Sequence, residues 1–328
     1  MPGEFAFVKI SGCILVVAVQ ALLLFYFCGW ADRLMDTCFG NNRCHVRRPG
    51  MQFDYLINKV DVCRWEPTET RLLVGVISSA DNFKQRQAIR ATWGGTSRRM
   101  GFKVVFFLGT TADDEVRRQV SEENDFHDDI VQGNFIDAYQ NLTFKTVMLI
   151  RWARDNCAQA SFVLKIDDDM LLSVWDLAAT LNQLQAARRT MWGWLYHRRK
   201  PVRNKTNKCY VSEKLYAPNV YPDFLSGTSY LISGDSVAIL AKGIEDEPFY
   251  PLEDVFLTGI VAEKVLVYRE SMAGFFCQHK RYRGPCAVPK LVTSHSWSPV
   301  MLKKLWKKVT SRLDLKLCRG LKDVQMIA

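Results

Sequence analysis

Three consecutive aspartates, Asp167, Asp168 and Asp169, are the part of the sequence that most directly suggests chemistry. They end an apolar run at residues 162–166, and a second apolar run follows them. Ionised carboxylates beside a buried strand are costly unless a partner neutralises them, and neighbouring carboxylates also repel one another. A hard divalent cation that prefers oxygen ligands, Mg²⁺ or Mn²⁺, would neutralise them. An isolated acidic triplet is more often a solvated turn, so other residues must decide between the two interpretations.

Two further acids and one histidine could work with the triplet. Glu253 and Asp254 lie at the start of an expected helix, where an acid is commonly only a cap that complements the helix dipole. The functional interpretation of this pair is a general base. His295 is one of five histidines and could supply a nitrogen ligand to the same metal. A lone histidine is otherwise a surface residue or a satisfied core residue.

Arg86 and Arg90 are four residues apart, so they project from one face of an expected helix. Two guanidinium groups just past a strand end could hold the phosphates of a nucleotide. They could equally form structural ion pairs with acidic residues further along the chain, and the spacing leaves both interpretations open. Gly227, in a turn of small residues, would let a ligand approach the backbone closely. A tight turn that enters a strand is the simpler interpretation of that segment.

The elements that must position these residues alternate along the chain. Apolar runs predict strands, and polar or amphipathic runs predict helices. Strands are expected at residues 71–79 (ending in a loop), 103–109, 130–131, 162–166 and 265–268; helices are expected at residues 83–93 (stopped by Gly94 and Gly95), 113–124, 142–157, 173–187 and 255–264. This alternation predicts a layered α/β domain with a mostly parallel central sheet. Ligands bind at the carboxyl ends of such strands, where Ser78 and the aspartates lie.

Composition narrows the class of protein. The chain has 328 residues, of which 48% are hydrophobic, and a net charge of +10, which suits an anionic ligand, a membrane surface or solubility. Its basic residues are mostly scattered and no nucleic-acid-binding signature is present, so we expect no nucleic-acid partner. The absence of GxGxxG and GxxxxGK[ST] sequences disfavours a dehydrogenase or a P-loop kinase. The basic segment after residue 300 has apolar residues at helical spacing, which predicts an amphipathic helix with a solvated face.

Residues 10–30 are uncharged and mostly apolar, the length of a membrane-spanning helix and longer than the apolar core of a signal peptide. We therefore expect a tail at residues 1–9, a signal anchor at residues 10–30, a stem at residues 31–70 and a folded domain at residues 71–328. Only Lys9 is basic before the span, whereas four arginines follow it at residues 33–48, and this distribution opposes translocation of the domain. The cysteines favour an oxidising lumen instead.

Ten cysteines occur, and eight of them lie outside the expected anchor and its edge. An even number without CxxC pairs indicates disulfides rather than a zinc site. Cys277 and Cys286 could close a short local loop. Sequons at Asn141 and Asn204 agree with a luminal domain.

Four stretches in order resemble the β1,3-glycosyltransferases, the family that includes β1,3-galactosyltransferases and β1,3-N-acetylglucosaminyltransferases. The stretches are residues 86–94, 165–169, 221–227 and 253–255, and the resemblance covers residues 71–300. It implies a GT-A-like fold, a UDP-sugar donor, Mn²⁺ as cofactor and a Golgi membrane protein of single-pass type II topology. Self-association into a homo-oligomer is compatible with it.

The resemblance also assigns roles to residues. The triplet matches the DxD motif, in which Asp169 contacts the metal and Asp167 contacts the ribose or the metal shell, while Asp254 matches the catalytic base. The expected metal ligands are Asp167, Asp169 and His295. The expected donor-binding residues are Arg86, Arg90, Ser78, Lys165, Asp167, Asp168 and Gly227.

The implied reaction is an inverting transfer of a sugar to the 3-hydroxyl of an acceptor glycan on a protein or lipid. Galactose is the preferred donor sugar, because residues 221–230 look closer to the galactosyltransferase members. The alternatives are transfer of N-acetylglucosamine or N-acetylgalactosamine, a metal-dependent hydrolase, and a carbohydrate-binding ectodomain without turnover. The basic segment at residues 188–214, expected to be an irregular loop, would contact the acceptor or be only a solvated loop.

Overall fold

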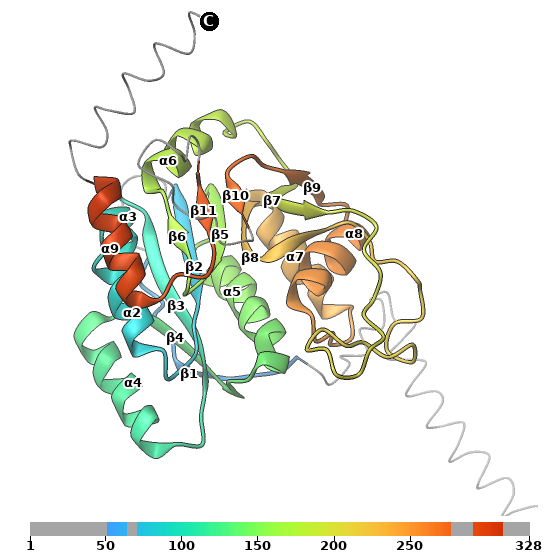
Figure 1. The fold of residues 1–328 in the computed structure, drawn as a ribbon, viewed down its shortest axis with the longest axis horizontal. Coiled ribbons are helices and arrows are strands. Elements are labelled where there is room, and N and C mark those ends of the chain that lie inside the picture. The colour runs from blue at the N-terminus through green and yellow to red at the C-terminus, as the bar shows by residue number, and fades with distance from the viewer. Residues whose placement is uncertain (1–50, 64–70, 277–290, 311–328) are drawn as a thin grey trace, which may run out of the picture. The chain divides into compact units, whose positions relative to one another are not determined.

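The computed structural model describes residues 51–63, 71–276 and 291–310, all within one compact unit that spans residues 49–328 (Figure 1). Its centre is an eight-stranded sheet in the order β1-β4-β3-β2-β5-β8-β7-β9. The bounds are β1 Tyr55–Ile57, β2 Leu72–Ile77, β3 Lys103–Thr110, β4 Ile130–Ile136, β5 Phe162–Asp167, β7 Thr190–Tyr196, β8 Phe224–Ser233 and β9 Tyr268–Ser271. β1 and β8 run antiparallel to their neighbours, and the other pairings are parallel. The prediction of a layered α/β domain with a mostly parallel central sheet is confirmed.

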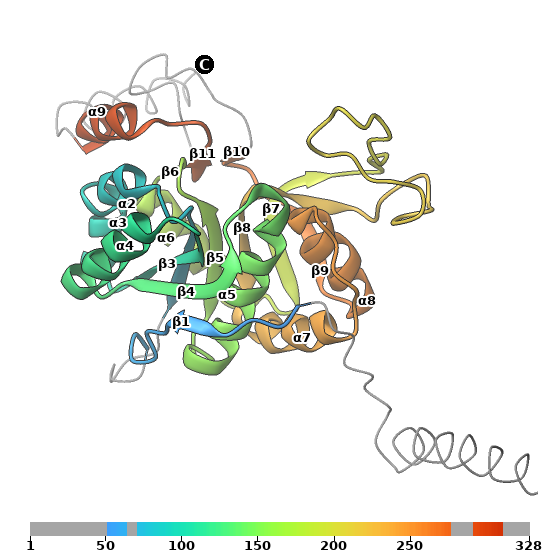
Figure 2. The same ribbon diagram turned by 90° about the horizontal axis from the view of Figure 1, so that it is seen from below.

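Helices cover both faces of this sheet (Figure 2). Their bounds are α2 Phe83–Arg90, α3 Trp93–Arg99, α4 Asp114–His127, η1 Tyr139–Asn141, α5 Leu142–Asn156, α6 Val174–Gln183, α7 Gly234–Glu245, η2 Val255–Val261, α8 Ala262–Lys264 and α9 Pro299–Thr310. A small second sheet joins β10 Phe275–Phe276, β11 Thr293–Ser294 and β6 Leu171–Leu172.

The central strands β2 and β3 are mostly apolar because both of their faces are buried. Along β2, Leu73 and Ile77 enter one core cluster, whereas Leu72 and Val74 enter the other. This alternation follows from the pleat of a strand, which sends successive side chains to opposite faces. Continuous apolar runs therefore identified these strands correctly.

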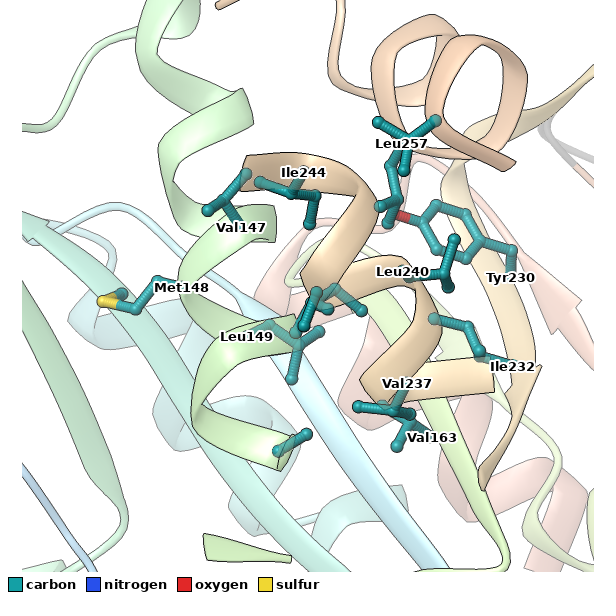
Figure 3. Packing of buried hydrophobic residues seen from close by; sticks show 14 of the residues in the cluster. Val147, Met148, Leu149, Val163, Tyr230, Ile232, Val237, Leu240, Ile244 and Leu257 are labelled. Carbon is teal, nitrogen blue, oxygen red and sulfur yellow. The ribbon is translucent and has the colours of Figure 1, made fainter. Parts of the chain in front are cut away.

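Helices α5 and α7 pack together over one face of the sheet (Figure 3). Val147 and Leu149 of α5 share a cluster with Val237, Leu240 and Ile244 of α7, all of them buried. Burial of each such side chain contributes about 1.5–3 kcal/mol relative to exposure. This packing holds α5 in place against that face of the sheet.

The expected stop at Gly94 and Gly95 was wrong. The chain leaves α2 at Arg90 and re-enters a helix at Trp93, so both glycines lie inside α3. A Cβ on Gly94 would lie 2.8 Å from the carbonyl oxygen of Ile89, and one on Gly95 would lie 2.5 Å from that of Arg90. The glycines therefore permit a close corner between two helices.

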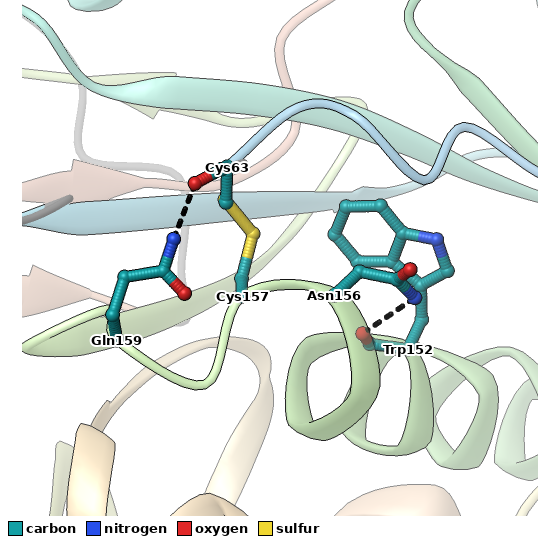
Figure 4. The surroundings of a disulfide bond; sticks show 5 residues. All are labelled: Cys63, Trp152, Asn156, Cys157 and Gln159. Atoms are coloured by element: carbon teal, nitrogen blue, oxygen red, sulfur yellow. Dashed lines mark hydrogen bonds between the residues drawn. A yellow bond between two sulfur atoms is a disulfide. The ribbon is translucent and has the colours of Figure 1, made fainter. Parts of the chain in front are cut away.

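Part of the expected stem belongs to the folded domain. β1 pairs with β4, Met51 is buried, and a disulfide joins Cys63 to Cys157 just beyond α5 (Figure 4). Gln159 donates a hydrogen bond to the carbonyl oxygen of Cys63. The boundary at residue 71 was therefore placed too late along the chain.

Among the described cysteines, Cys209 forms no disulfide, which departs from the expectation of complete pairing. The suggested Cys277–Cys286 pair lies outside the described residues. Within the described ranges no helix is long and apolar enough to cross a membrane, and the expected anchor at residues 10–30 lies outside them.

Two strands differ from the sequence prediction. Residues 190–196, expected to belong to an irregular loop, form β7 in the middle of the β8-β7-β9 group. β9 begins at Tyr268, later than expected, because Leu266 has a positive φ of 58° and the N–H of Val267 bonds back to Ala262. The helix end thus occupies the residues expected to start the strand.

Candidate active site

The acidic triplet lies at the carboxyl edge of the sheet, as expected. Ile77, the last residue of β2, is in register with Asp167, the last residue of β5. The next residues therefore meet: the Ser78 hydroxyl donates to Asp168 Oδ2 at 2.7 Å, and Asn82 Nδ2 donates to the same oxygen at 2.9 Å. Burial raises the pKa of Asp168, while these two hydrogen bonds oppose the rise. Asp168 thus anchors the β2–α2 loop to the triplet.

Lys165 provides a fixed buried cation next to the triplet. It is 2% exposed and lies on the same face of β5 as Asp167, two residues away. Its Nζ lies 2.6 Å from Asp167 Oδ1 and 3.1 Å from Glu253 Oε1, and it donates to the carbonyl of Gly227. Burial would lower the pKa of Lys165, but Asp167 and Glu253 hold it above its ordinary value. The lysine therefore stays charged.

Asp167 responds to the same surroundings in the opposite sense. Burial raises its pKa to about 6, despite the attraction of Lys165, and the charges of Glu253 and Asp169 add to the rise. The structure thus places one oxygen of Asp167 against a lysine. The expectation that Asp167 binds the metal directly applies at most to its other oxygen.

Glu253 belongs to the site, although the sequence prediction of site residues named only its neighbour Asp254. Its Oε2 accepts hydrogen bonds from Thr146 at 3.0 Å and from the Tyr230 hydroxyl at 3.1 Å, while Oε1 faces Lys165. The side chain is buried, and each of its oxygens has a protein partner. Glu253 is therefore a fixed negative charge rather than a group open to substrate.

Asp254 points differently and is only half-buried. Val255 N–H donates to its Oδ1 at 2.8 Å, and Gly227 N–H donates to its Oδ2 at 3.3 Å. Burial and the adjacent charge of Glu253 raise its pKa to about 7, against the opposing effects of Lys165 and the two N–H groups. A carboxylate with that pKa can accept a proton near neutral pH.

Gly227 does allow a close approach, but the group that approaches is a carboxylate of the protein. A Cβ at this position would lie 2.6 Å from Glu253 Oε1 and 3.3 Å from the Cβ of Asp254. Any side chain here would displace the two acids. We call Lys165, Asp167, Glu253 and Asp254 the carboxylate cluster; Gly227 is the backbone that holds it together.

Asp169 and His295 meet although they are far apart in sequence. β11 pairs with β6 so that Ser294 lies opposite Leu171, and Trp297 N–H bonds to the Asp169 carbonyl at 2.8 Å. His295 Nε2 then lies 3.1 Å from Asp169 Oδ2, a contact that raises the pKa of His295.

These two side chains fit one side of a metal site. Asp169 Oδ1 is buried and accepts no hydrogen bond within the described ranges. A carboxylate oxygen and an imidazole nitrogen are suitable donors for Mn²⁺. No group of three or more His, Cys, Asp or Glu side chains in the described part of the chain could hold a metal. Beyond what this part of the chain supplies, diphosphate oxygens and water are the usual ligands of nucleotide-bound cations.

Arg86 is buried and fully paired within the protein, so it has no N–H group left for the donor substrate, contrary to the sequence prediction. It is 0% exposed, and all five of its N–H groups have protein partners. It pairs with Glu123 through Nε at 2.9 Å and Nη2 at 2.6 Å. The remaining N–H groups donate to the Ser78 hydroxyl and to the carbonyl oxygens of Ser79 and Ala80. Arg86 therefore shapes the loop that carries Ser78.

Arg90 is equally committed to protein contacts. It binds Asp129 through two nitrogens, at 2.9 and 2.7 Å, and reaches Glu123 at 2.5 Å. Arg98 also pairs with Asp129. Of the two interpretations that the spacing left open, the structural ion pair is therefore correct. We call Arg86, Arg90, Arg98, Glu123 and Asp129 the arginine cluster.

Lys145 is a further buried cation that sequence reasoning missed. Its Nζ donates to the Ser78 carbonyl at 2.9 Å and to Asp137 at 2.8 Å, and it is 3% exposed. The available signal was a single lysine in the mostly apolar first half of the expected helix at residues 142–157. Lys145 thus supports the Ser78 loop from the face opposite α2.

Comparisons with known proteins identify the family of this chain. The galactosyltransferase family model matches residues 84–273. The lactosylceramide 1,3-N-acetyl-beta-D-glucosaminyltransferase A of Danio rerio is 34% identical over 79% of this chain and 70% of its own length. Beta-1,3-galactosyltransferase 1 of Homo sapiens is 31% identical over 85% of each chain, and beta-1,3-galactosyltransferase 5 of Pan paniscus is 36% identical over 75% of this chain and 82% of its own.

Among solved structures, a glycosyltransferase involved in glycosylation of the major capsid of PBCV-1 aligns with a TM-score of 0.40 and 9% identity, over 72% of this chain and 98% of its own. That likeness carries no weight in the assignment. The match of the family model over more than half of the chain, together with the relatives above 30% identity, shows that this protein belongs to the galactosyltransferase family of hexosyltransferases.

Proposed function

We propose that the protein transfers galactose from UDP-galactose to the 3-hydroxyl of an acceptor glycan, with inversion of the anomeric carbon and with Mn²⁺ as cofactor. The observation that carries this proposal is the half-buried Asp254, held by two N–H groups and with a pKa of about 7. A group of this kind suits a general base. The named activities of the relatives support the linkage and the class of sugar.

Asp254 would take the proton from the acceptor hydroxyl as that oxygen attacks the anomeric carbon. Near pH 7 a substantial fraction of this carboxylate is ionised, and its basicity is higher than that of an ordinary aspartate. The N–H groups of Val255 and Gly227 hold its orientation. Because UDP-galactose is α-linked, one in-line displacement gives a β-linked product, and no covalent enzyme intermediate is needed.

Lys165 and Glu253 would set the electrostatics around that base. Lys165 keeps the buried acids from repelling one another, and Glu253 keeps the affinity of Asp254 for a proton high. Asp169 and His295 would hold Mn²⁺ with the donor diphosphate. The bound metal would supply Lewis-acid stabilisation of the negative charge on the departing UDP.

N-acetylglucosamine is the second candidate for the transferred sugar. The Danio rerio relative, whose name specifies N-acetylglucosaminyl transfer, is 34% identical, within the same range as the galactosyltransferases. We also propose a Golgi lumen location with a type II anchor. The disulfide between Cys63 and Cys157 and the exposed sequon at Asn204 support an oxidising, glycosylating compartment.

The test uses the full chain, purified in detergent with Mn²⁺ and incubated with UDP-galactose or UDP-N-acetylglucosamine. Acceptors ending in galactose, N-acetylglucosamine or N-acetylgalactosamine are offered, and UDP release and product linkage are measured. We expect fastest release with UDP-galactose and a β1,3 linkage by NMR. A faster reaction with UDP-N-acetylglucosamine would replace the donor assignment. An α-linked product, or binding without transfer, would overturn the mechanism.

A further inference from the structure

The connection between β7 and β8 is strongly basic. Residues 197–221 contain seven Lys and Arg residues and one acidic residue, Glu213. This segment projects from the ends of β7 and β8 that it connects, as both views show (Figures 1 and 2). At its start lies an open cavity of about 590 Å³, which we call the basic hollow. It is lined by Trp194, Leu195, Tyr196, His197, Arg198, Arg199 and Lys200.

The backbone of the basic hollow is fixed by specific contacts. Arg198 N–H donates to Asp223 Oδ1 at 3.0 Å, and Tyr221 N–H donates to the Arg199 carbonyl at 2.8 Å. Asp223 also pairs with His197 at 2.8 Å. The cations are therefore displayed from a defined loop, although their side chains are exposed.

Arg203 fixes the rest of the loop. Its guanidinium donates to the carbonyl oxygens of Val211, Tyr216 and Pro218. Further along, Lys208 Nζ lies 5.5 Å from the centre of the Tyr139 ring. Burial raises the pKa of Tyr139, followed by its interaction with Cys209 of the same loop, and the charges of Asp254 and Asp167 add to the rise.

The basic hollow and the candidate base lie at the same edge of the sheet. β5 and β7 both run antiparallel to β8, so their carboxyl ends coincide. Tyr196 pairs with Phe224 of β8, and Gly227, which contacts Asp254, is three residues further along that strand. Three residues of a strand span about 10 Å, a distance that a short oligosaccharide can cover.

The anion expected in the basic hollow is not the donor diphosphate. Asp169 and His295, the pair suited to a metal–diphosphate, come from β5 and the β6–β11 sheet. In the order of the large sheet, β8 separates β5 from β7, the strand that leads into the hollow. The proposed reaction has two substrates, a donor and an acceptor. With the donor diphosphate at Asp169 and His295, the acceptor is the substrate left for the basic hollow.

We propose that the basic hollow is an acceptor subsite for an acidic saccharide, one whose carboxylate or sulfate group is bound by Arg198, Arg199 and Lys200 while its reactive hydroxyl lies at Asp254. This inference rests on the proposed function, because it assigns the acceptor class of that same reaction. Each exposed cation of this kind contributes little binding free energy to an anion, but three together contribute more. Salt screens the attraction.

The experiment compares the KM of one core oligosaccharide in neutral, carboxylated and sulfated forms, using the full chain. We expect the acidic forms to have a KM about tenfold lower at low salt, with the advantage shrinking at 0.5 M salt. The better of the two acidic forms identifies the anionic group. Equal KM values for neutral and acidic forms would overturn the proposal.

Two variants with equal loss of charge locate the effect. The first combines Arg198→Asn, Arg199→Gln and Lys200→Gln, where Asn tolerates the positive φ of 45° at position 198. The second removes three exposed lysines of α9 through Lys303→Gln, Lys304→Gln and Lys307→Gln. We expect the first to lose the preference for acidic acceptors and the second to keep it. Loss in both would mean that net charge, not the hollow, is responsible.

A binding measurement separates this inference from the proposed function. Asp254→Asn protein is titrated with the sulfated and carboxylated oligosaccharides by calorimetry, with and without the triple substitution in the hollow. Binding that the triple substitution weakens supports the subsite even where no transfer is measured. Absence of transfer with every donor and acceptor would count against the proposed function instead. Binding that the triple substitution leaves unchanged overturns the subsite.

Discussion

The arginine cluster and the carboxylate cluster are both largely buried groups of charges, but they differ in balance. The arginine cluster extends from the β2–α2 loop to the amino end of β4, whereas the carboxylate cluster lies at the carboxyl end of β5. In the arginine cluster, Arg86 and Arg90 together with Arg98 meet Glu123 and Asp129 through paired hydrogen bonds. The carboxylate cluster holds three acids but one cation, Lys165, which pairs with Asp167 and Glu253. In the first cluster, the two buried arginines are matched by two acids, and the partly exposed Arg98 adds one further positive charge. The second cluster keeps an excess of negative charge.

This difference separates structural from chemical roles. A buried ion pair whose hydrogen bonds are all satisfied has nothing left to offer a substrate, and removing one partner leaves a costly buried charge. In the carboxylate cluster, burial and, to a smaller extent, the neighbouring acids raise the pKa values, to about 6 for Asp167 and about 7 for Asp254. Perturbed acids of that kind are typical of functional sites. The predictions below test this contrast from the largest expected effect to the smallest.

Replacing Asp254 by Asn removes the proposed base while keeping its size. We expect transfer to fall by about 10³-fold, within the range for loss of general-base catalysis, with the Kd for UDP nearly unchanged. Single-turnover rates and calorimetric titration with UDP measure the two quantities. Transfer at the wild-type rate would remove Asp254 from the base role.

The same variant should be more stable than the wild type at pH 8. The pKa of Asp254 is higher in the folded protein than in the unfolded chain, so the folded state binds more protons between about pH 4 and pH 7. Stability contributed by this group is therefore lost as pH rises through that window. Asn at this position does not ionise, so the Tm of the variant should fall less between pH 5 and pH 8 than the Tm of the wild type.

Arg86→Leu tests the opposite cluster. The variant leaves Glu123 short of a buried partner and the Ser79 and Ala80 carbonyl oxygens without their donors, which should cost about 3–5 kcal/mol of unfolding free energy. Denaturant melts measure this loss. Because Arg86 is fully buried behind the loop, the folded fraction should bind UDP almost normally. A large rise in the Kd for UDP with unchanged stability would support the sequence prediction that Arg86 contacts the donor substrate directly.

Asp169→Asn tests the pair expected to hold the metal. Losing the carboxylate charge beside His295 should raise the Mn²⁺ concentration that gives half-maximal activity by at least about tenfold. A titration with Mn²⁺ in chelator-buffered solution measures this, and Asp176→Asn on α6 is a control for loss of an acid elsewhere. Full wild-type activity in excess EDTA would rule out the metal altogether.

The elements predicted most successfully were those defined by local pattern. Strands β2, β3 and β5 are apolar on both faces, and such runs are visible without knowledge of their neighbours. The carboxyl-end rule then brought Ser78 and the aspartates to one edge, which the register of β2 and β5 confirms. β7 was missed because basic residues follow it directly, so the segment was interpreted as a loop.

The side-chain partners could not be predicted, because they are long-range. Arg86 has the same helical spacing whether or not Glu123 lies against it, 37 residues away. Glu253 and Asp254 are adjacent in sequence, yet their surroundings differ. Glu253 is buried and bound by the side chains of Thr146 and Tyr230, whereas Asp254 is half-buried and bound by backbone N–H groups. Only the packing of α5 and β8 around them separates their roles.

The smallest expected effect concerns how Glu253 sets the pH dependence of Asp254. Glu253→Gln keeps an oxygen for Thr146 and Tyr230 but removes the negative charge that raises the pKa of Asp254. The acidic limb of the kcat/KM profile should therefore move to lower pH, by about half a unit or more. Glu122→Gln, on the exposed face of α4, is the matched control and should leave the profile in place. A profile that does not move in Glu253→Gln would mean that burial alone, rather than the unbalanced pair of acids, makes Asp254 a base near pH 7.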